Sequence, residues 1–212
     1  MRNKENTWTS DRISEGGIGL IQQRVTEDPE YLTERDYVGD TPLMTAVSFD
    51  HFDLVKFMLE QGADPNAEVD DGYSCLLTAI EGEDLISLKI VELLLNYKAD
   101  IHYKGINGWT ALHMAACRGY VDKAKTLLAA GSRVNERIEI DGEETPLITA
   151  ASQGHAEMVK LLLDHGADPS LEDLIMEKNA LEMAIYNSQG PDLEVCEMLA
   201  EEDYQSALEE AM

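Results

Sequence analysis

Apolar residues recur along this chain at the three- and four-residue spacing of short amphipathic helices, and the clearest pair lies within residues 145–170. Thr145 suits an N-cap and Pro146 suits the first helical position, so a first helix is predicted from there to Gly154. A second helix follows and ends at Gly166, because glycine readily adopts the left-handed C-terminal cap. Its predicted apolar face consists of Met158, Val159, Leu161, Leu162 and Leu163. Two short helices cannot bury such a face alone, so the hairpin needs similar hairpins on either side.

Two short sequence marks recur in step and supply those copies. A six-residue mark, TPLMTA in its first copy, starts at positions 41, 74, 110, 145 and 179, with spacings of 33, 36, 35 and 34 residues. A second mark, GADPN in its first copy, starts at positions 62, 98, 131 and 166. The pattern closely resembles the ankyrin repeat, which has the signature T-P-L-H-x-A and about 33 residues per unit. The resemblance implies an all-α fold: an α-solenoid of helix-turn-helix units with projecting β-turn fingers, in one elongated domain.

The register of the two marks divides the chain into segments. Terminal repeats are expected to be atypical, because one of their faces meets solvent. The expected segments are a flexible N-terminus at 1–10, an N-terminal half-repeat cap at 11–35, repeats at 36–68, 69–104, 105–137 and 138–172, and a degenerate C-terminal capping repeat with an acidic tail at 173–212.

Repeats 2 and 4 depart from the regular length. Repeat 2 has three residues more between its two marks than repeat 1, and the surplus around 81–87 predicts a bulged turn between its helices. Lys98 takes the cap position held by Gly62 in repeat 1, and a side chain in that left-handed conformation costs about 1–2 kcal/mol. Two extra residues within 138–144 predict a longer finger before Thr145.

The charge balance is strongly acidic, which restricts the partners. Lys and Arg number 16 against 42 Asp and Glu, for a formal net charge of −26. This is far from the basic footprint of a nucleic-acid-binding protein, so neither nucleic acid nor an anionic membrane is expected as a partner. A protein partner with a basic surface is expected instead, because complementary fields speed encounter and reject acidic competitors.

Cysteine usage and the absence of targeting signals predict a cytoplasmic chain. Cys75, Cys117 and Cys196 fall in predicted helices without C-x-x-C spacing, so neither a disulfide framework nor a zinc site is indicated. Residues 1–12 hold no apolar signal region, and no apolar run reaches the roughly 18 residues of a membrane span. A monomer is expected.

Histidine is the first candidate for acid–base or metal chemistry, but four of the five histidines occupy repeat positions. His51 and His155 follow predicted first helices at equivalent positions, and His165 precedes a cap glycine. His113 fills the histidine of the T-P-L-H mark, and the resemblance to ankyrin repeats implies that it braces the turn. No H-E-x-x-H motif occurs, so no catalytic metal site is predicted.

Other catalytic motifs are missing as well. Residues 64–72 alternate oxygen-bearing side chains, but a calcium loop needs Gly and Glu where the chain has Val69 and Cys75. No G-x-S-x-G motif occurs, no histidine lies in register to activate a cysteine, and the glycines at 16–19 lack phosphate-loop spacing. No catalytic residue, cofactor or metal is predicted, and the chain is not expected to be an enzyme.

A protein-binding surface remains the expected functional feature. The resemblance implies that a partner meets the finger tips and the exposed side of the first helices, which together form a concave face. By register this face carries Tyr37, Asp40, Phe49, Asp71, Tyr73, Glu81, Asn107, Trp109, Arg118, Glu144 and Gln153, with Ile80 beside Glu81. Aromatic side chains within an acidic rim are typical of binding surfaces. In the alternative interpretation, Tyr73 and Trp109 only pack one finger against the next.

The leading hypothesis is a non-enzymatic protein-protein interaction module that binds a basic partner through this concave face. One alternative is an acidic inhibitor or immunity protein that neutralises a basic toxin or nuclease. A second alternative, an enzyme or metal-binding protein on a repeat scaffold, would require a stoichiometric metal or cofactor.

Overall fold

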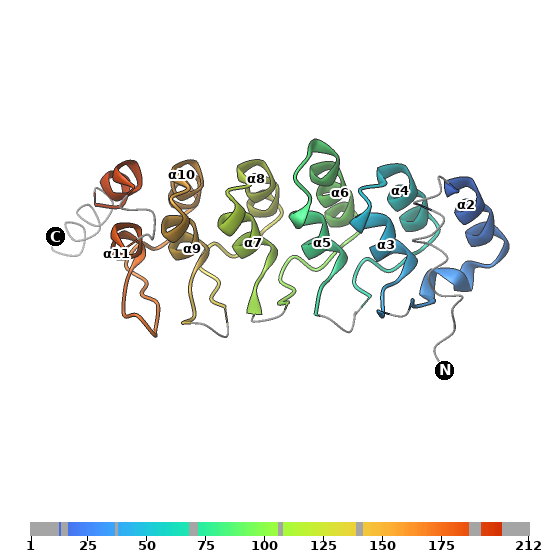
Figure 1. Cartoon of the computed structure of the whole chain (residues 1–212), viewed down its shortest axis with the longest axis horizontal. Helices are drawn as coiled ribbons and strands as arrows, with labels where there is room; N and C mark the ends of the chain where they lie inside the picture. Colours follow the sequence, from blue (N-terminus) through green and yellow to red (C-terminus); the bar gives the residue numbers. More distant parts are fainter. Residues whose placement is uncertain are drawn as a thin grey trace. The chain divides into compact units, whose positions relative to one another are not determined.

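The computed structural model describes residues 13, 17–36, 38–67, 72–105, 108–138, 142–186 and 192–200. Helices make up the regular structure of these residues, apart from one isolated antiparallel bridge between Asp173 and Lys178. The predicted all-α repeat architecture is confirmed, as successive helical hairpins in Figure 1. The chain forms two compact units, Met1–Ile106 and Asn107–Met212, which are taken in turn.

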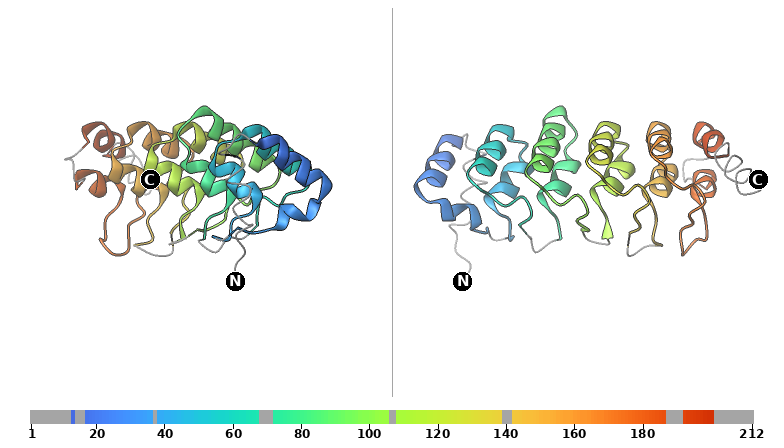
Figure 2. Two further views of the ribbon diagram at one scale, coloured as in Figure 1. Left: turned by 45° about the vertical axis from the view of Figure 1, so that its right-hand side comes forward. Right: turned by 180° about the vertical axis from the view of Figure 1, so that it is seen from behind.

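In the first unit, the N-terminal elements precede two helical hairpins. Its elements are α2 (Ile18–Glu27), the 3₁₀ helix η2 (Pro29–Thr33), α3 (Pro42–Ser48), α4 (Phe52–Glu60), α5 (Cys75–Glu81) and α6 (Leu85–Asn96). First helices α3 and α5 contact each other, and second helix α4 contacts α2 and α6, so two helical layers result (Figure 2). Leu43, Leu54, Met58, Leu76 and Ile90 fill the space between the layers, each at most 2% exposed.

The second unit repeats the arrangement. Its elements are α7 (Ala111–Arg118), α8 (Val121–Ala129), α9 (Pro146–Gln153), α10 (Ala156–Asp164) and α11 (Ala180–Ile185), followed by helical residues 193–200. Helix α9 contacts α7 on one side and α11 on the other. Its residues Leu147 and Ile148 are each 1% exposed, so α9 forms the centre of this unit.

The six-residue mark recurs because it starts each first helix in the same way. Thr41, Ser74, Thr110 and Thr145 each accept a hydrogen bond, through the side-chain oxygen, from the backbone N–H three residues later. Asn179 does the same at α11. Such caps satisfy amide groups that the helix cannot, and each contributes about 1 kcal/mol.

The predicted bulge in repeat 2 is wrong. Gly82–Asp84 connects α5 to α6 in three residues, the same length as Phe49–His51 between α3 and α4, while α6 has 12 residues against 9 in α4. The surplus lengthens α6 because the Asp84 carboxylate caps it early, accepting bonds from the N–H groups of Ile86 and Ser87. Lys98 has φ 68°, as expected for the left-handed cap.

Candidate functional site

Asparagine side chains hold together the bases of neighbouring hairpins. Asn66 donates to the Lys98 carbonyl at 2.9 Å and accepts from the Asp100 N–H at 2.7 Å. In the second unit, Asn135 donates to the Gly166 carbonyl at 3.3 Å and accepts from the Asp168 N–H at 2.9 Å. Each amide therefore bonds both a donor and an acceptor of the next repeat, which fixes the base from which a finger projects.

The finger before α3 is closed by its own side chains. Asp36 Oδ1 accepts from the N–H groups of Val38 and Asp40 at 2.9 and 3.0 Å, and Arg35 donates to the Gly39 carbonyl at 2.8 Å. The predicted site residue Asp40 is half-buried at the base of this finger. Tyr37 lies outside the described residues. This turn is therefore shaped before any partner arrives.

In the first unit, the predicted surface residues at the ends of α3 and α5 differ in exposure. Phe49 is 44% exposed and Glu81 is exposed, while Tyr73 is half-buried and donates its hydroxyl to Glu81 Oε1 at 3.2 Å. Ile80 is fully buried, so its placement on the exposed side was wrong: the last turn of α5 directs it into the core. Asp71 lies outside the described residues.

In the second unit, Trp109 lies at the start of α7 and is half-buried. Its ring centroid is 6.3 Å from that of His113, with the planes tilted by 55°. Part of the indole thus packs on the scaffold and part remains accessible. Arg118 and Gln153, at the last positions of α7 and α9, are exposed as predicted, and Asn107 lies outside the described residues.

His113 braces the turn, as the resemblance implied. Its Nδ1 accepts from the Thr110 N–H, so the ring proton belongs on Nε2, which lies 3.3 Å from the Glu144 carbonyl oxygen and donates to it. Glu144 is half-buried and its carboxylate accepts from the Thr149 hydroxyl at 3.2 Å. Glu144 is therefore a scaffold contact as well as a predicted surface residue.

The other histidines of the second unit also bond to the backbone. His155 Nε2 is 3.0 Å from the Cys117 carbonyl oxygen, and His165 Nδ1 is 2.8 Å from that of Leu161. Gly119 accommodates the His155 ring, because a Cβ there would come within 2.9 Å of it. Among the described residues, no group of three or more His, Cys, Asp or Glu side chains is arranged to hold a metal ion.

The cysteine thiols lie in environments that disfavour the thiolate. Burial raises the pKa of Cys75 to about 12, with the carboxylates of Asp40 and Asp64 adding to the effect. Burial also raises the pKa values of Cys117 and Cys196. Since the thiolate is the nucleophile, all three thiols are less reactive at neutral pH than an ordinary cysteine.

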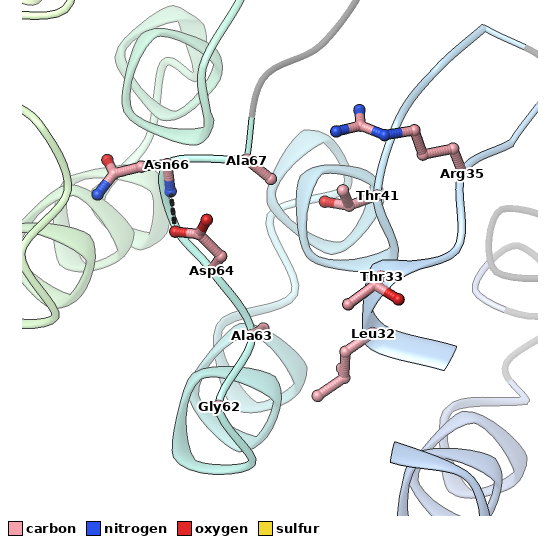
Figure 3. A pocket seen from close by; sticks show the side chains of 9 residues that line it. All are labelled: Leu32, Thr33, Arg35, Thr41, Gly62, Ala63, Asp64, Asn66 and Ala67. Atoms are coloured by element: carbon pink, nitrogen blue, oxygen red, sulfur yellow. Dashed lines mark hydrogen bonds between the residues drawn. The ribbon is translucent and has the colours of Figure 1, made fainter. Parts of the chain in front are cut away.

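A shallow cavity of about 410 Å³ lies in the first unit, between η2 and the turn at residues 62–67 that follows α4. Figure 3 shows Arg35 and Asp64 on opposite sides of the cavity, with the Leu32 side chain extending toward Gly62. Leu32 and Thr33 of η2 line this cavity together with Gly62 and Ala63.

Sequence reasoning overlooked the finger before α11. Leu174, Ile175 and Met176 at its tip are 60%, 72% and 50% exposed. Three consecutive large apolar residues between Asp173 and Glu177 are the signal for it in the sequence, whereas the repeat register predicts only a degenerate cap there.

Comparisons with known proteins agree with this architecture. A family model of ankyrin repeats in three copies matches residues 43–138 and 134–208. Similar proteins include human transient receptor potential cation channel subfamily A member 1 (35% identical over 196 residues), palmitoyltransferase AKR1 of Lachancea kluyveri (27% over 152) and an ankyrin repeat and KH domain-containing protein of Caenorhabditis briggsae (32% over 154).

These matches cover 73%, 71% and 71% of this chain but only 17%, 20% and 6% of those relatives. The chain therefore corresponds to a small part of each of them. No helix in the described part of the chain combines the length and apolar character needed to cross a bilayer. With capped hairpins in both units and a family model that matches most of its length, this chain belongs to the ankyrin-repeat family.

Proposed function

We propose that this chain is a non-enzymatic interaction module that binds a protein partner with a basic surface through its fingers and the exposed ends of its first helices. Ankyrin repeats are protein-interaction modules, and this general role applies to the chain. The observation that carries the finer proposal is the partial exposure of Trp109 at a finger base held by the buried His113.

A partly packed aromatic side chain and exposed polar residues on neighbouring first helices favour protein binding. Trp has few rotatable bonds and a large contact area, so ordering it at an interface costs little entropy. In the second unit, exposed Arg118 and Gln153 lie at the ends of the first helices α7 and α9. In the first unit, Glu81 is the last residue of α5 and Phe49 directly follows α3. The ends of the first helices thus offer a partner one apolar side chain, Phe49, and three polar ones.

The acidic charge supports a basic partner. A net charge of −26 attracts cationic surfaces over roughly the Debye length of 8–10 Å and repels acidic ones. Association should therefore slow as salt is raised. The three free cysteines support a reducing compartment, such as the cytoplasm, for this encounter.

Affinity capture from the native source, with wild type, Trp109→Ala and Tyr120→Ala as baits, tests the proposal. Tyr120 is a half-buried aromatic residue of the same unit. It takes the N-cap position of α8 and lies outside the fingers, so it is a matched control. Capture of a basic protein by wild type and Tyr120→Ala, and its loss with folded Trp109→Ala, is expected. Equal capture by all three baits would show that the finger surface is misassigned.

A further inference from the structure

The finger that leads into α11, residues 172–178, presents an apolar tip. Ile175 is 72% exposed, and its neighbours Leu174 and Met176 are 60% and 50% exposed. In Figure 1 this segment projects from α11 away from the helices of its own unit. Projecting turns favour small and polar residues, so three adjacent large apolar side chains in such a turn require an explanation.

The turn is closed by Asp173, whose side chain is buried at 2% exposure. Its Oδ1 accepts hydrogen bonds from the N–H groups of Ile175, at 2.9 Å, and Met176. Its own N–H donates to the Lys178 carbonyl and its carbonyl accepts from the Glu177 N–H, both at 2.9 Å. One residue therefore fixes both sides of the turn and directs the tip side chains outward.

Contacts with the preceding finger hold the base in place. The Leu174 N–H donates to the Gly142 carbonyl at 2.7 Å. Arg137 Nη1 donates to the carbonyls of Glu143, at 3.1 Å, and Glu172, at 3.0 Å, and so joins the two fingers. A tip whose backbone is already ordered loses little conformational entropy on binding.

The charges around the tip indicate whether it enters a membrane or an apolar protein pocket. Glu172 and Glu177 flank it and are exposed, whereas Lys178, the basic residue of this finger, places its Nζ 3.3 Å from the centroid of the Tyr186 ring. Carboxylates beside the tip oppose insertion into an anionic membrane surface. They favour an apolar protein pocket with Lys or Arg at its rim.

We propose that the tip Leu174–Met176 inserts into an apolar, basic-rimmed pocket on a partner protein. The inference deepens the proposed function, on which it rests, by assigning a second anchor and the shape and charge of the surface that receives it. Burial of three such side chains, each worth one to two powers of ten in affinity at an interface, makes the tip a principal contact.

Residue-specific photocrosslinking in an extract of the native source tests the inference. A photoreactive phenylalanine analogue replaces Ile175 in one bait and Leu193 in the control, because Leu193 is equally exposed at 72% but lies on a helix. The bait at 175 is expected to give one predominant product whose cross-linked segment is apolar and flanked by Lys or Arg. Equal products from both positions, or a segment without basic neighbours, would overturn the proposal.

The cross-linked protein is then purified and its Kd measured. Leu174→Ser/Ile175→Ser/Met176→Ser should weaken binding about a thousandfold or more, and Glu172→Lys/Glu177→Lys about tenfold, while Leu193→Ser stays within twofold. Unfolding midpoints near that of wild type show that the variants are folded. An unchanged Kd for the triple variant, or its loss of binding to phosphatidylserine vesicles that wild type binds, would contradict the protein pocket.

Trp109→Ala in the same cross-linking bait separates the two proposals. If Trp109→Ala leaves both the cross-linked product at 175 and the capture efficiency unchanged, the result supports binding by the tip and rejects binding by the Trp109 surface. Loss of capture with Trp109→Ala, together with an unaffected Kd for the tip variant, supports the Trp109 surface and rejects the tip.

Discussion

The segments that lead into α7 and α11 share one kind of helix cap but differ in what their other side chains contact. Both helices begin with a capping box, formed by Thr110 with His113 and by Asn179 with Glu182. Before α7, Trp109 packs partly on His113, whereas before α11 the side chains of Leu174–Met176 remain at least half exposed. The caps build the scaffold in both places, and the side chains beside them are left to differ.

Removing core volume from α9 should weaken both regions together and gives the largest expected effect on stability. Leu147 is 1% exposed in the helix that contacts both α7 and α11. Leu147→Ala should lower the free energy of unfolding by about 2–5 kcal/mol, as measured by urea denaturation. Leu193→Ala, at a 72% exposed position, should change it by less than about 0.5 kcal/mol. Similar values for the two variants would show that α9 is not the shared core.

A substitution at Gly142 should affect the α11 finger alone. Gly142 has φ 98°, and a Cβ there would collide with the carboxylate of Asp173. Gly142→Ala should therefore lower the free energy of unfolding by about 2–4 kcal/mol and accelerate hydrogen exchange at the Leu174 amide. Gly131→Ala is the matched control, because its φ is 102° but no atom lies within 4 Å of an added Cβ. Equal losses of unfolding free energy in the two variants would show that the collision with Asp173 does not contribute.

Removal of the α7 cap should destabilise the Trp109 region alone. The expected loss of unfolding free energy is smaller than that of Gly142→Ala. Thr110→Ala deletes the oxygen that accepts from the His113 N–H, with an expected loss of about 0.5–2 kcal/mol in urea denaturation. Thr110→Ser keeps that oxygen and should lose only a few tenths. Faster exchange at Leu174 in Thr110→Ala would contradict the independence of the two regions.

The recurrence of the sequence marks made the fold predictable, because each mark corresponds to a physical requirement. Thr145 and its equivalents cap helices, and the left-handed conformation expected of Lys98 follows from the position it fills in the register. Register alone could not predict which element takes up the three surplus residues of repeat 2. The outcome depended on Asp84 capping α6 early, a local choice that counting residues between marks cannot reveal.

The candidate surface was less predictable than the fold. Register located the ends of the first helices well enough for Arg118 and Gln153, but the one-residue difference between Ile80 and Glu81 reverses burial in the last helical turn. The α11 finger was not predictable as a surface because its proposed role depends on the exposure of the tip. That exposure follows from the buried Asp173 and the bonds to the preceding finger, which join residues far apart in the sequence.

The affinity of Trp109→Ala for the captured partner tests the central claim most directly, namely that side chains beside the caps bind while the caps themselves support the fold. Isothermal titration should show binding weakened by about 2 kcal/mol or more, close to thirtyfold in Kd, while the free energy of unfolding falls by less than that. A Kd equal to that of wild type in the folded variant would contradict the claim.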